Sequence, residues 1–345
     1  MSRPFILITG GSGYFGSRLR ERLREGGHAV RVFDLVDTDD RAKDVEFVPG
    51  DIRDAGHLAK AMTDCDVIFH CVAQVPLAKD KQLFHSVNVH GTGNLLRAAL
   101  EARVRKVIYL SSSAVFGAPR SNPVTEETPP APGEAYGRAK LEGETLCRQF
   151  EQRGLDVTII RPRTIMGHGR LGIFQILFEW IREGFNVPVL GRGDNVYQFV
   201  HADDLAEACI LAASRPGAAT YHCGAADFGT MRAALEQLCA HAKTGSRVRS
   251  VPMAPTVCLM KVTSTLGLSP LGAYHALMYG RPMYFDIRKA QRELGWQPHH
   301  SNNEMFIQSY EWYLANRESI LRTRGASHHR SAVKQGILAL VKHIL

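Results

Sequence analysis

The first sixteen residues of the chain constrain its fold more than any other stretch. Residues 5–8 form a continuous apolar run, and a glycine-rich segment, residues 9–16, follows directly. Leu19 and Leu23 then continue, at helical spacing, an apolar stripe that begins at Phe15. This pattern predicts a buried parallel strand, a tight turn and the N-terminus of a helix.

The turn carries Gly10, Gly13 and Gly16, with Tyr14 and Phe15 between the last two. A backbone without Cβ atoms can approach a pyrophosphate closely, while the unpaired N–H groups and the dipole of the helix face its negative charge. The spacing GxxGxxG is weak by itself, because a glycine-rich turn without a ligand would have the same pattern.

An acidic residue at the end of the next strand favours the nucleotide site. Residues 29–33 are predicted to form this strand, and Asp34 follows the glycine turn by about twenty residues, the distance at which a carboxylate reaches the ribose hydroxyls of adenosine. A carboxylate there would repel a 2′-phosphate, so the sequence predicts NAD rather than NADP.

Apolar strand candidates alternate with helical stretches through the first half of the chain. The expected strands are 45–48, 67–72, 107–110 and 157–160, and the expected helices are 55–62, 83–102 and 135–150. Such alternation implies βαβ units with right-handed crossovers. The predicted fold class is α/β, a Rossmann-type doubly wound parallel sheet with a smaller C-terminal substrate-binding α/β subdomain.

Ligands in this fold lie beyond the carboxyl ends of the strands. Asp51 and Ile52 follow the third strand, and Val72 and Ala73 follow the fourth. Asp51 could accept a hydrogen bond from an adenine amino group, and the small residues would let a dinucleotide lie flat. A loop acid and a close-packed turn without a ligand are the alternatives.

A serine-rich stretch, Ser111–Ser113, follows the fifth strand, and Tyr136 and Lys140 lie four residues apart in the next predicted helix. At this spacing both side chains lie on one face, about 6 Å apart along the axis. A phenol with a pKa of about 10 is a poor base, but a nearby ammonium and a cationic nicotinamide stabilise the phenolate. Lys140 can also bind the nicotinamide ribose, and a serine hydroxyl would orient the substrate oxygen.

These motifs together resemble those of the extended short-chain dehydrogenases/reductases, the NAD-dependent epimerase/dehydratase family. The resemblance covers residues 5 to about 300 and implies a Rossmann fold, NAD as cofactor and reversible hydride transfer. The further motifs that carry it are Asn88–Leu96, Arg161–Pro162, Phe199–Asp204, Asp286, Lys289–Ala290 and Leu294–Pro298.

The resemblance also implies roles for single residues. Ser112 is the catalytic serine, with Ser113 as the runner-up, Tyr136 is the general base or acid, and Lys140 is its activator. Asn88 supports the active-site network. The cofactor-binding residues implied beyond the glycine turn are Asp34, Asp51, Ile52, Val72, Ala73, Asn88, Ser111, Tyr136, Lys140 and Pro162.

The substrate is where the branches of the family differ. Nucleotide-sugar 4,6-dehydratases carry an Asp–Glu pair after the catalytic hydroxyl, and this chain has Ser113–Ala114 there, so dehydration is not expected. Nucleotide-sugar epimerases usually carry an Asn and an Arg where this chain has Thr164 and Tyr197, and losing the Arg removes charge-assisted bonds to a diphosphate. The arginines that could replace it are Arg163, Arg170, Arg192 and Arg281.

Two other elements resemble the 3β-hydroxysteroid dehydrogenase branch: residues 161–169, with RPxxIxG, and residues 191–195, with GxGxN. Residues 252–279 agree with this branch, because they contain no acid and many apolar side chains. They are interpreted either as an apolar substrate lid or membrane-dipping element, or as a buried helix pair.

We therefore favour an NAD-dependent oxidoreductase acting on a secondary alcohol or ketone of a bulky, partly apolar substrate. A nucleotide-sugar epimerase similar to UDP-galactose 4-epimerase is the alternative, because the same residues serve both reactions. A non-catalytic NAD-binding sensor is the third hypothesis; such relatives typically lose the Tyr or the Lys, and this chain retains both. The candidate substrate contacts are Ser113, Arg163, Thr164, Arg192 and Tyr197.

Composition bears on compartment and partners. The N-terminal apolar run is too short for a secretory leader, so a cytoplasmic protein is expected. The seven scattered cysteines suit a reducing compartment, and neither they nor the histidines show a metal-ligand spacing, so no metal is expected. The net charge is +8, but no nucleic-acid module accompanies it, so no nucleic-acid partner is expected.

The chain divides into two expected domains and a tail. Residues 1–165 would bind NAD, with later strands returning around 196–225; residues 166–195 and 226–320 would form the substrate subdomain, and 321–345 a basic amphipathic tail. Peripheral contact with the inner membrane face through 252–280 or 326–345 is one hypothesis, and packing on the domain or a second subunit is the other. The family implies a homodimer.

Overall fold

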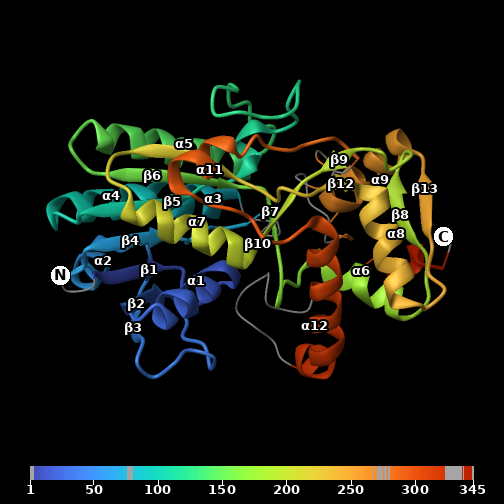
Figure 1. Cartoon of the computed structure of the whole chain (residues 1–345), viewed down its shortest axis with the longest axis horizontal. Helices are drawn as coiled ribbons and strands as arrows, with labels where there is room; N and C mark the ends of the chain where they lie inside the picture. The colour runs from blue at the N-terminus through green and yellow to red at the C-terminus, as the bar shows by residue number, and fades with distance from the viewer. Residues whose placement is uncertain are drawn as a thin grey trace.

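A seven-stranded parallel sheet forms the N-terminal part of this computed structural model, at the left of Figure 1. The strand order is β11-β6-β5-β4-β1-β2-β3, which confirms the predicted Rossmann-type sheet. The bounds are β1 Phe5–Thr9, β2 Ala29–Asp34, β3 Glu46–Pro49, β4 Val67–His70, β5 Lys106–Leu110, β6 Val157–Pro162 and β11 Ala219–Cys223. The structure describes residues 4–75, 81–266, 268–269, 275, 278, 280–322, 336 and 338–343.

Both faces of the sheet are buried, because successive residues of each strand point to opposite sides. In β1, Ile6 and Ile8 belong to one core and Leu7 to the other. The first core is covered by α1 Tyr14–Glu25, α7 Ala202–Ser214 and α11 Arg288–Leu294; the second is covered by α2 Ala55–Ala61, α4 Thr92–Glu101 and α5 Ala135–Glu151. The order of strands reverses between β1 and β4, and this switch point places a ligand crevice at their carboxyl ends.

The helix predicted at 83–102 is interrupted. The structure has α3 Lys81–His85, a π-helical turn at Ser86–Gly91 and then α4. Within the turn, Gly91 packs so tightly on Ile52 that a Cβ atom would lie 2.5 Å from its Cγ2. Wide turns of this kind often occur at functional positions, and this one holds Asn88.

The C-terminal part has its own core and lies at the right of Figure 1. Three small pairs of strands, β7 with β10, β9 with β12 and β8 with β13, lie outside the main sheet in the described residues, so of the strands at 196–225 only β11 returns to it. The elements of this part are β7 Thr164–Met166, α6 Ile173–Arg182, β8 Val187–Leu190, β9 Val196–Tyr197, β10 Phe199–His201, β12 Gly229–Thr230, α8 Met231–Ala242, β13 Val248–Val251, α9 Met253–Thr265, α12 Asn302–Arg322 and α13 Leu338–Val341.

The described part of the tail packs on this second core. Leu338 and Val341 of α13 contact it, and Lys342 Nζ lies 2.6 Å from Glu183 Oε2. Most of the predicted amphipathic tail, including Val333, lies outside the described residues. None of the helices in the described ranges is long and apolar enough to cross a membrane.

Candidate active site

A cavity of about 1420 Å³ opens at the carboxyl ends of the central strands and continues into the C-terminal part. It collects most of the residues predicted for the site. Those that line it are Gly10, Gly13, Tyr14, Phe15, Gly16, Asp34, Asp51, Ile52, Val72, Ala73, Ser111, Ser112, Ser113, Tyr136, Lys140, Pro162, Arg163, Thr164 and Tyr197. Their convergence comes from distant segments, which the parallel sheet brings to one edge.

The glycine turn fits a dinucleotide. Gly10 has a φ of +80°, and a Cβ atom there would lie 2.7 Å from the backbone nitrogen of Val72. A Cβ atom on Gly16 would lie 2.1 Å from the carbonyl oxygen of Gly10. Gly13 is the N-cap of α1 and supplies no side-chain cap, and the first turn carries no acid. The first N–H groups of α1 therefore face the cavity in a geometry suited to a pyrophosphate.

Asp34 lies at the end of β2, where the predicted ribose contact belongs. Its carboxylate accepts hydrogen bonds from the backbone N–H groups of Ser12, at 3.0 Å, and Leu35, at 2.8 Å. Burial raises the pKa of Asp34, and these hydrogen bonds act in the opposite direction. Asp51, the predicted adenine contact, is paired with Arg53, which lowers its pKa.

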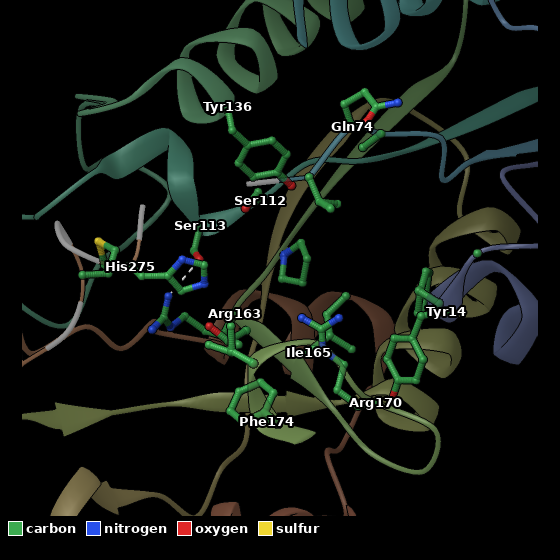
Figure 2. Close-up of a pocket in the computed structure, with 18 of the residues that line it drawn as sticks. Tyr14, Gln74, Ser112, Ser113, Tyr136, Arg163, Ile165, Arg170, Phe174 and His275 are labelled. Carbon is green, nitrogen blue, oxygen red and sulfur yellow. Dashed lines mark hydrogen bonds between the residues drawn. The ribbon is translucent and has the colours of Figure 1, made fainter. Parts of the chain in front are cut away.

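Tyr136 projects from α5 into the cavity beside Ser112 (Figure 2). Glu134 caps the helix, because its carboxylate accepts from the N–H groups of Tyr136, at 2.7 Å, and Gly137, at 2.6 Å. Burial raises the pKa of the Tyr136 phenol to about 12, while a hydrogen bond from Ser112 and the charge of Arg170 act to lower it. Ser112 thus stabilises the phenolate.

Lys140 lies one helical turn further along α5 and is 2% exposed. Its ammonium donates to the carbonyl oxygen of Leu110 at 2.8 Å and lies 5.0 Å from the centre of the Tyr109 ring. Burial lowers the pKa of Lys140 to about 8. Its effect on Tyr136, predicted from the four-residue spacing, stays a prediction, because the groups that lower the pKa of Tyr136 are Ser112 and Arg170.

Asn88 and Arg192 do not line the cavity, and neither does Arg281, one of the four candidate arginines. Asn88 is buried behind its wall and bonds to the backbone of Gln74, so it acts on the site by positioning the chain after β4. Arg192 has a side chain that is 90% exposed and pairs with Asp194 at 3.4 Å. The turn after β8 carries Arg192 to the surface, so the structure does not bring it together with the other candidate substrate contacts.

A buried ion pair supports the serine-rich end of β5. Glu144 of α5 is fully buried and accepts from Ser111 Oγ at 2.6 Å. Arg161 of β6 donates Nε and Nη2 to the same carboxylate at 2.8 and 2.6 Å. Because every oxygen of Glu144 has a charged or hydroxyl donor, α5 is fixed against β5 and β6, and the orientation of Ser111 is fixed with it.

The far end of the cavity is apolar. Its walls are side chains of α6, β8, α8, α9, α12 and α13. These are Phe174, Ile176, Leu177, Trp180, Val189, Leu190, Met231, Leu235, Leu259, Met260, Phe306, Leu338 and Val341. Thr164 and Tyr197 also line the cavity, and their hydroxyl oxygens are 3.0 Å apart. Residues 252–279 thus contribute to the wall through α9, while Val262 of α9 and Leu266, which follows the helix, are exposed to solvent.

Sequence reasoning missed one residue of this cavity and left another undecided. His275 belongs to an apolar segment that gave no sign of a polar function, and Arg170 was one of four arginines with no means to rank them. Both line the cavity. The Arg170 charge lies near enough to His275 to help burial lower the His275 pKa to about 4. In the part of the chain that the structure describes, no group of three or more His, Cys, Asp or Glu could hold a metal ion.

Comparison with known proteins identifies the family. Residues 6–224 match the model of the NAD dependent epimerase/dehydratase family, more than half of the chain. The chain belongs to this family. It is therefore an NAD-dependent enzyme of the extended short-chain dehydrogenase/reductase type, as the sequence motifs predicted.

Three relatives of this epimerase/dehydratase family member have different names: one is an uncharacterized protein, one an epimerase and one a dehydrogenase. The uncharacterized protein y4nG of Sinorhizobium fredii is 55% identical over 340 residues, 98% of this chain and 86% of that protein. The UDP-glucose 4-epimerase of Mycolicibacterium smegmatis is 33% identical, covering 61% and 74%. The human sterol-4-alpha-carboxylate 3-dehydrogenase, decarboxylating, is 33% identical, covering 60% and 57%.

Solved structures agree with the family fold. The Bordetella bronchiseptica enzyme WbmG, solved in complex with NAD, superposes with a TM-score of 0.74 at 21% identity, over 91% of this chain and 95% of that one. At this identity the likeness supports the fold alone. The substrate has to be argued from the cavity.

Proposed function

We propose that this family member is a dehydrogenase or reductase that transfers a hydride between NAD and a secondary carbinol of a bulky, partly apolar substrate. The observation that carries the proposal is the apolar far end of the cavity, which includes Phe174, Trp180 and Leu338. An apolar chamber favours a substrate that loses apolar surface from water on binding. The sterol-4-alpha-carboxylate 3-dehydrogenase relative bears a name consistent with such a substrate.

NAD, when bound, supplies the hydride acceptor or donor at C4 of its nicotinamide ring. In oxidation, the Tyr136 phenolate removes the proton of the substrate hydroxyl, and Ser112 donates a hydrogen bond to the same oxygen. Before the substrate binds, the same Ser112 hydroxyl donates to the Tyr136 phenolate and stabilises it. In the reverse direction, the Tyr136 phenol protonates the oxygen of the ketone. Lys140, which lines the same cavity one helical turn from Tyr136, would bind the ribose hydroxyls of the cofactor.

A nucleotide-sugar epimerase is the second candidate, because a relative at 33% identity is named UDP-glucose 4-epimerase. The Thr164–Tyr197 contact weighs against it. Where an Asn and an Arg would bind the diphosphate sugar, this chain has two hydroxyl groups that contact each other at 3.0 Å. An uncharged pair lacks the charge-assisted bonds that a diphosphate requires.

The proposal is tested by following NADH absorbance. Purified enzyme is mixed with NAD and either a 3β-hydroxysteroid or UDP-glucose. A dehydrogenase releases NADH in bulk with the hydroxysteroid and leaves UDP-glucose unchanged. Formation of UDP-galactose without net NADH would instead establish the epimerase. If Tyr136→Phe left the cellular phenotype intact, the non-catalytic NAD sensor would replace both.

A further inference from the structure

Arg163 is the residue of the cavity wall whose environment the proposed function does not explain. It follows β6 and is 1% exposed. Its Nη1 donates to Ser113 Oγ at 2.8 Å, and its guanidinium carbon lies 4.6 Å from the centre of the Tyr197 ring and 5.6 Å from that of Phe285. One hydrogen bond and two rings thus fix the plane of the guanidinium.

The other edge of this guanidinium has no protein partner. Both Nε and Nη2 of Arg163 are buried, and neither has a hydrogen-bond acceptor among the described residues. Within the same ranges, no carboxylate forms an ion pair with Arg163. A buried charge with two unsatisfied donors strongly destabilises a fold unless another molecule supplies the acceptors. Because Arg163 lines the cavity, that molecule is a ligand of the cavity.

The free edge has a clear chemical preference in this chain. The same Nε and Nη2 atoms of Arg161 bind the Glu144 carboxylate at 2.8 and 2.6 Å. Those of Arg317 bind Glu179 at 3.0 and 2.7 Å. This edge presents two parallel N–H bonds that match the two oxygens of a carboxylate. We infer that the free edge of Arg163 binds a carboxylate of the substrate.

The hydrogen bond to Ser113, the residue after Ser112, places Arg163 at the serine-rich end of the cavity. Figure 2 shows Arg163 on the Ser112 and Ser113 side of the pocket, with Tyr14 at the opposite side. Tyr14 marks the glycine turn, so the free edge of Arg163 lies away from the predicted pyrophosphate site. The guanidinium of Arg163 lies against the rings of Tyr197 and Phe285, and its free edge offers two N–H donors, which match the two oxygens of one carboxylate.

The inferred substrate class is therefore a bulky apolar hydroxy acid. This inference rests on the proposed function, since it assigns a further group to the substrate of the same site. Arg163 would bind the carboxylate, while the apolar end of the cavity takes the rest of the molecule. Arg163 would orient the carbinol toward Tyr136 and thereby favour acids over their uncharged analogues.

The test compares binding of two probes to the full-length enzyme loaded with NADH. They are 3-hydroxydodecanoate and its methyl ester, which share the apolar chain and differ in the charge that Arg163 would bind. Isothermal titration should give a dissociation constant about tenfold or more lower for the acid, the effect of one charge-assisted bidentate contact. Equal affinities for acid and ester, or no binding of the acid, would overturn the inference.

Variants then assign the preference to Arg163. Arg163→Gln should weaken acid binding about tenfold and leave ester binding unchanged, and Arg163→Lys should retain part of the preference. Arg105 is an exposed arginine outside the cavity, so Arg105→Gln is the matched control and should keep the full preference for the acid. If Arg163→Gln does not fold, the affinities of acid and ester for the wild-type enzyme and for Arg163→Lys still test the assignment. A preference that survives in both Arg163 variants would overturn the assignment.

Parallel assays separate the two proposals. Formation of NADH from the ester without any preference for the acid would overturn the carboxylate site and leave the dehydrogenase standing. A preference for the acid that depends on Arg163, with no NADH formed from either probe or from hydroxysteroids, would overturn the dehydrogenase and leave the site standing. Uridine diphosphate is the third probe: binding that Arg163→Gln abolishes would assign the edge to a diphosphate and overturn the carboxylate.

Discussion

Asn88 and Gln74 form two hydrogen bonds to each other that resemble a rung of a β-ladder. The N–H of Gln74 donates to Asn88 Oδ1 at 2.8 Å, and Asn88 Nδ2 donates to the carbonyl oxygen of Gln74 at 3.0 Å. The side chain of one residue thus satisfies both backbone groups of another. The chain after β4 is held by the π-helical turn, although Asn88 does not touch the cavity itself.

Asn88→Ala should therefore damage stability and activity together. It leaves the two backbone groups of Gln74 without partners in a partly buried site, and we expect a loss of about 2–3 kcal/mol in the free energy of unfolding. Urea denaturation measures this loss. The chain after β4 should also become more mobile, and kcat should fall, because this segment forms the cavity wall near Val72 and Ala73. A variant with wild-type kcat would show that the wall keeps its shape without Asn88.

Gly16→Ala should weaken NAD binding. The added methyl would meet the carbonyl oxygen of Gly10 at 2.1 Å, so the turn or α1 must shift. We expect a loss of about tenfold or more in affinity, measured by fluorescence titration with NADH, because the N–H groups then miss the phosphates. Gly93→Ala, inside α4 and 3.7 Å from its nearest neighbour, is the control. It should bind NAD normally and gain up to about 1 kcal/mol in stability.

Ser112→Ala should change the pH dependence of oxidation. Since the Ser112 hydrogen bond lowers the pKa of Tyr136, its removal raises that pKa above the wild-type value of about 12. At any lower pH the variant then has less phenolate. We expect kcat at neutral pH to fall about a hundredfold, and the rate to keep rising with pH over about pH 6 to 10. A variant profile that levels off at lower pH than the wild type would contradict the role of Ser112.

His70 should make the fold sensitive to acid. The buried ring lies between the hydroxyls of Thr9, at 2.7 Å, and Thr92, at 3.0 Å, and burial lowers its pKa from 6.5 to about 3. Below about pH 6.5, His70 binds a proton in the unfolded chain but not in the folded one. The free energy of unfolding therefore falls as the pH falls, until the pH reaches the pKa of His70 in the folded protein. The contribution of His70 to this fall in the free energy of unfolding approaches about 1.4 kcal/mol per pH unit.

Urea denaturation at several pH values checks this slope. His70→Asn should lose stability less steeply with falling pH than the wild type, whatever its stability at neutral pH. His57→Gln, at an exposed site on α2, is the control for loss of an imidazole. Parallel slopes in wild type and His70→Asn would show that other groups account for the acid sensitivity.

Glu144→Ala should be among the most damaging single changes. It leaves the Arg161 guanidinium buried without its carboxylate, and we expect a loss of about 3–5 kcal/mol in the free energy of unfolding. Asp51→Ala removes the acid from a more exposed pair with Arg53 and should cost less than about 1 kcal/mol. Thermal and urea unfolding of the two variants measure the contrast. Equal losses would mean that burial of the pair does not matter here.

Much of the fold could be predicted because its signals are local. The run at Phe5–Thr9, the glycines after it and Asp34 after the next strand each follow from rules of backbone conformation and periodicity. The same holds for α5, which begins at Ala135 as predicted and carries Tyr136 and Lys140 on one face. The π-helical turn at Ser86–Gly91 could not be predicted, because it depends on the contacts of Asn88 and Gly91 with distant segments.

The sequence by itself determined the parallel sheet, the NAD-binding turn and the tyrosine–lysine pair, since strand periodicity, glycine spacing and helical spacing are properties of neighbouring residues. Only the tertiary structure decided which of the candidate arginines line the cavity. Arg163 and Arg192 both follow strands, but packing against Tyr197 and Phe285 buries the first, and the turn after β8 exposes the second. Burial and unsatisfied donors arise from contacts between distant residues, so no local pattern distinguishes the two.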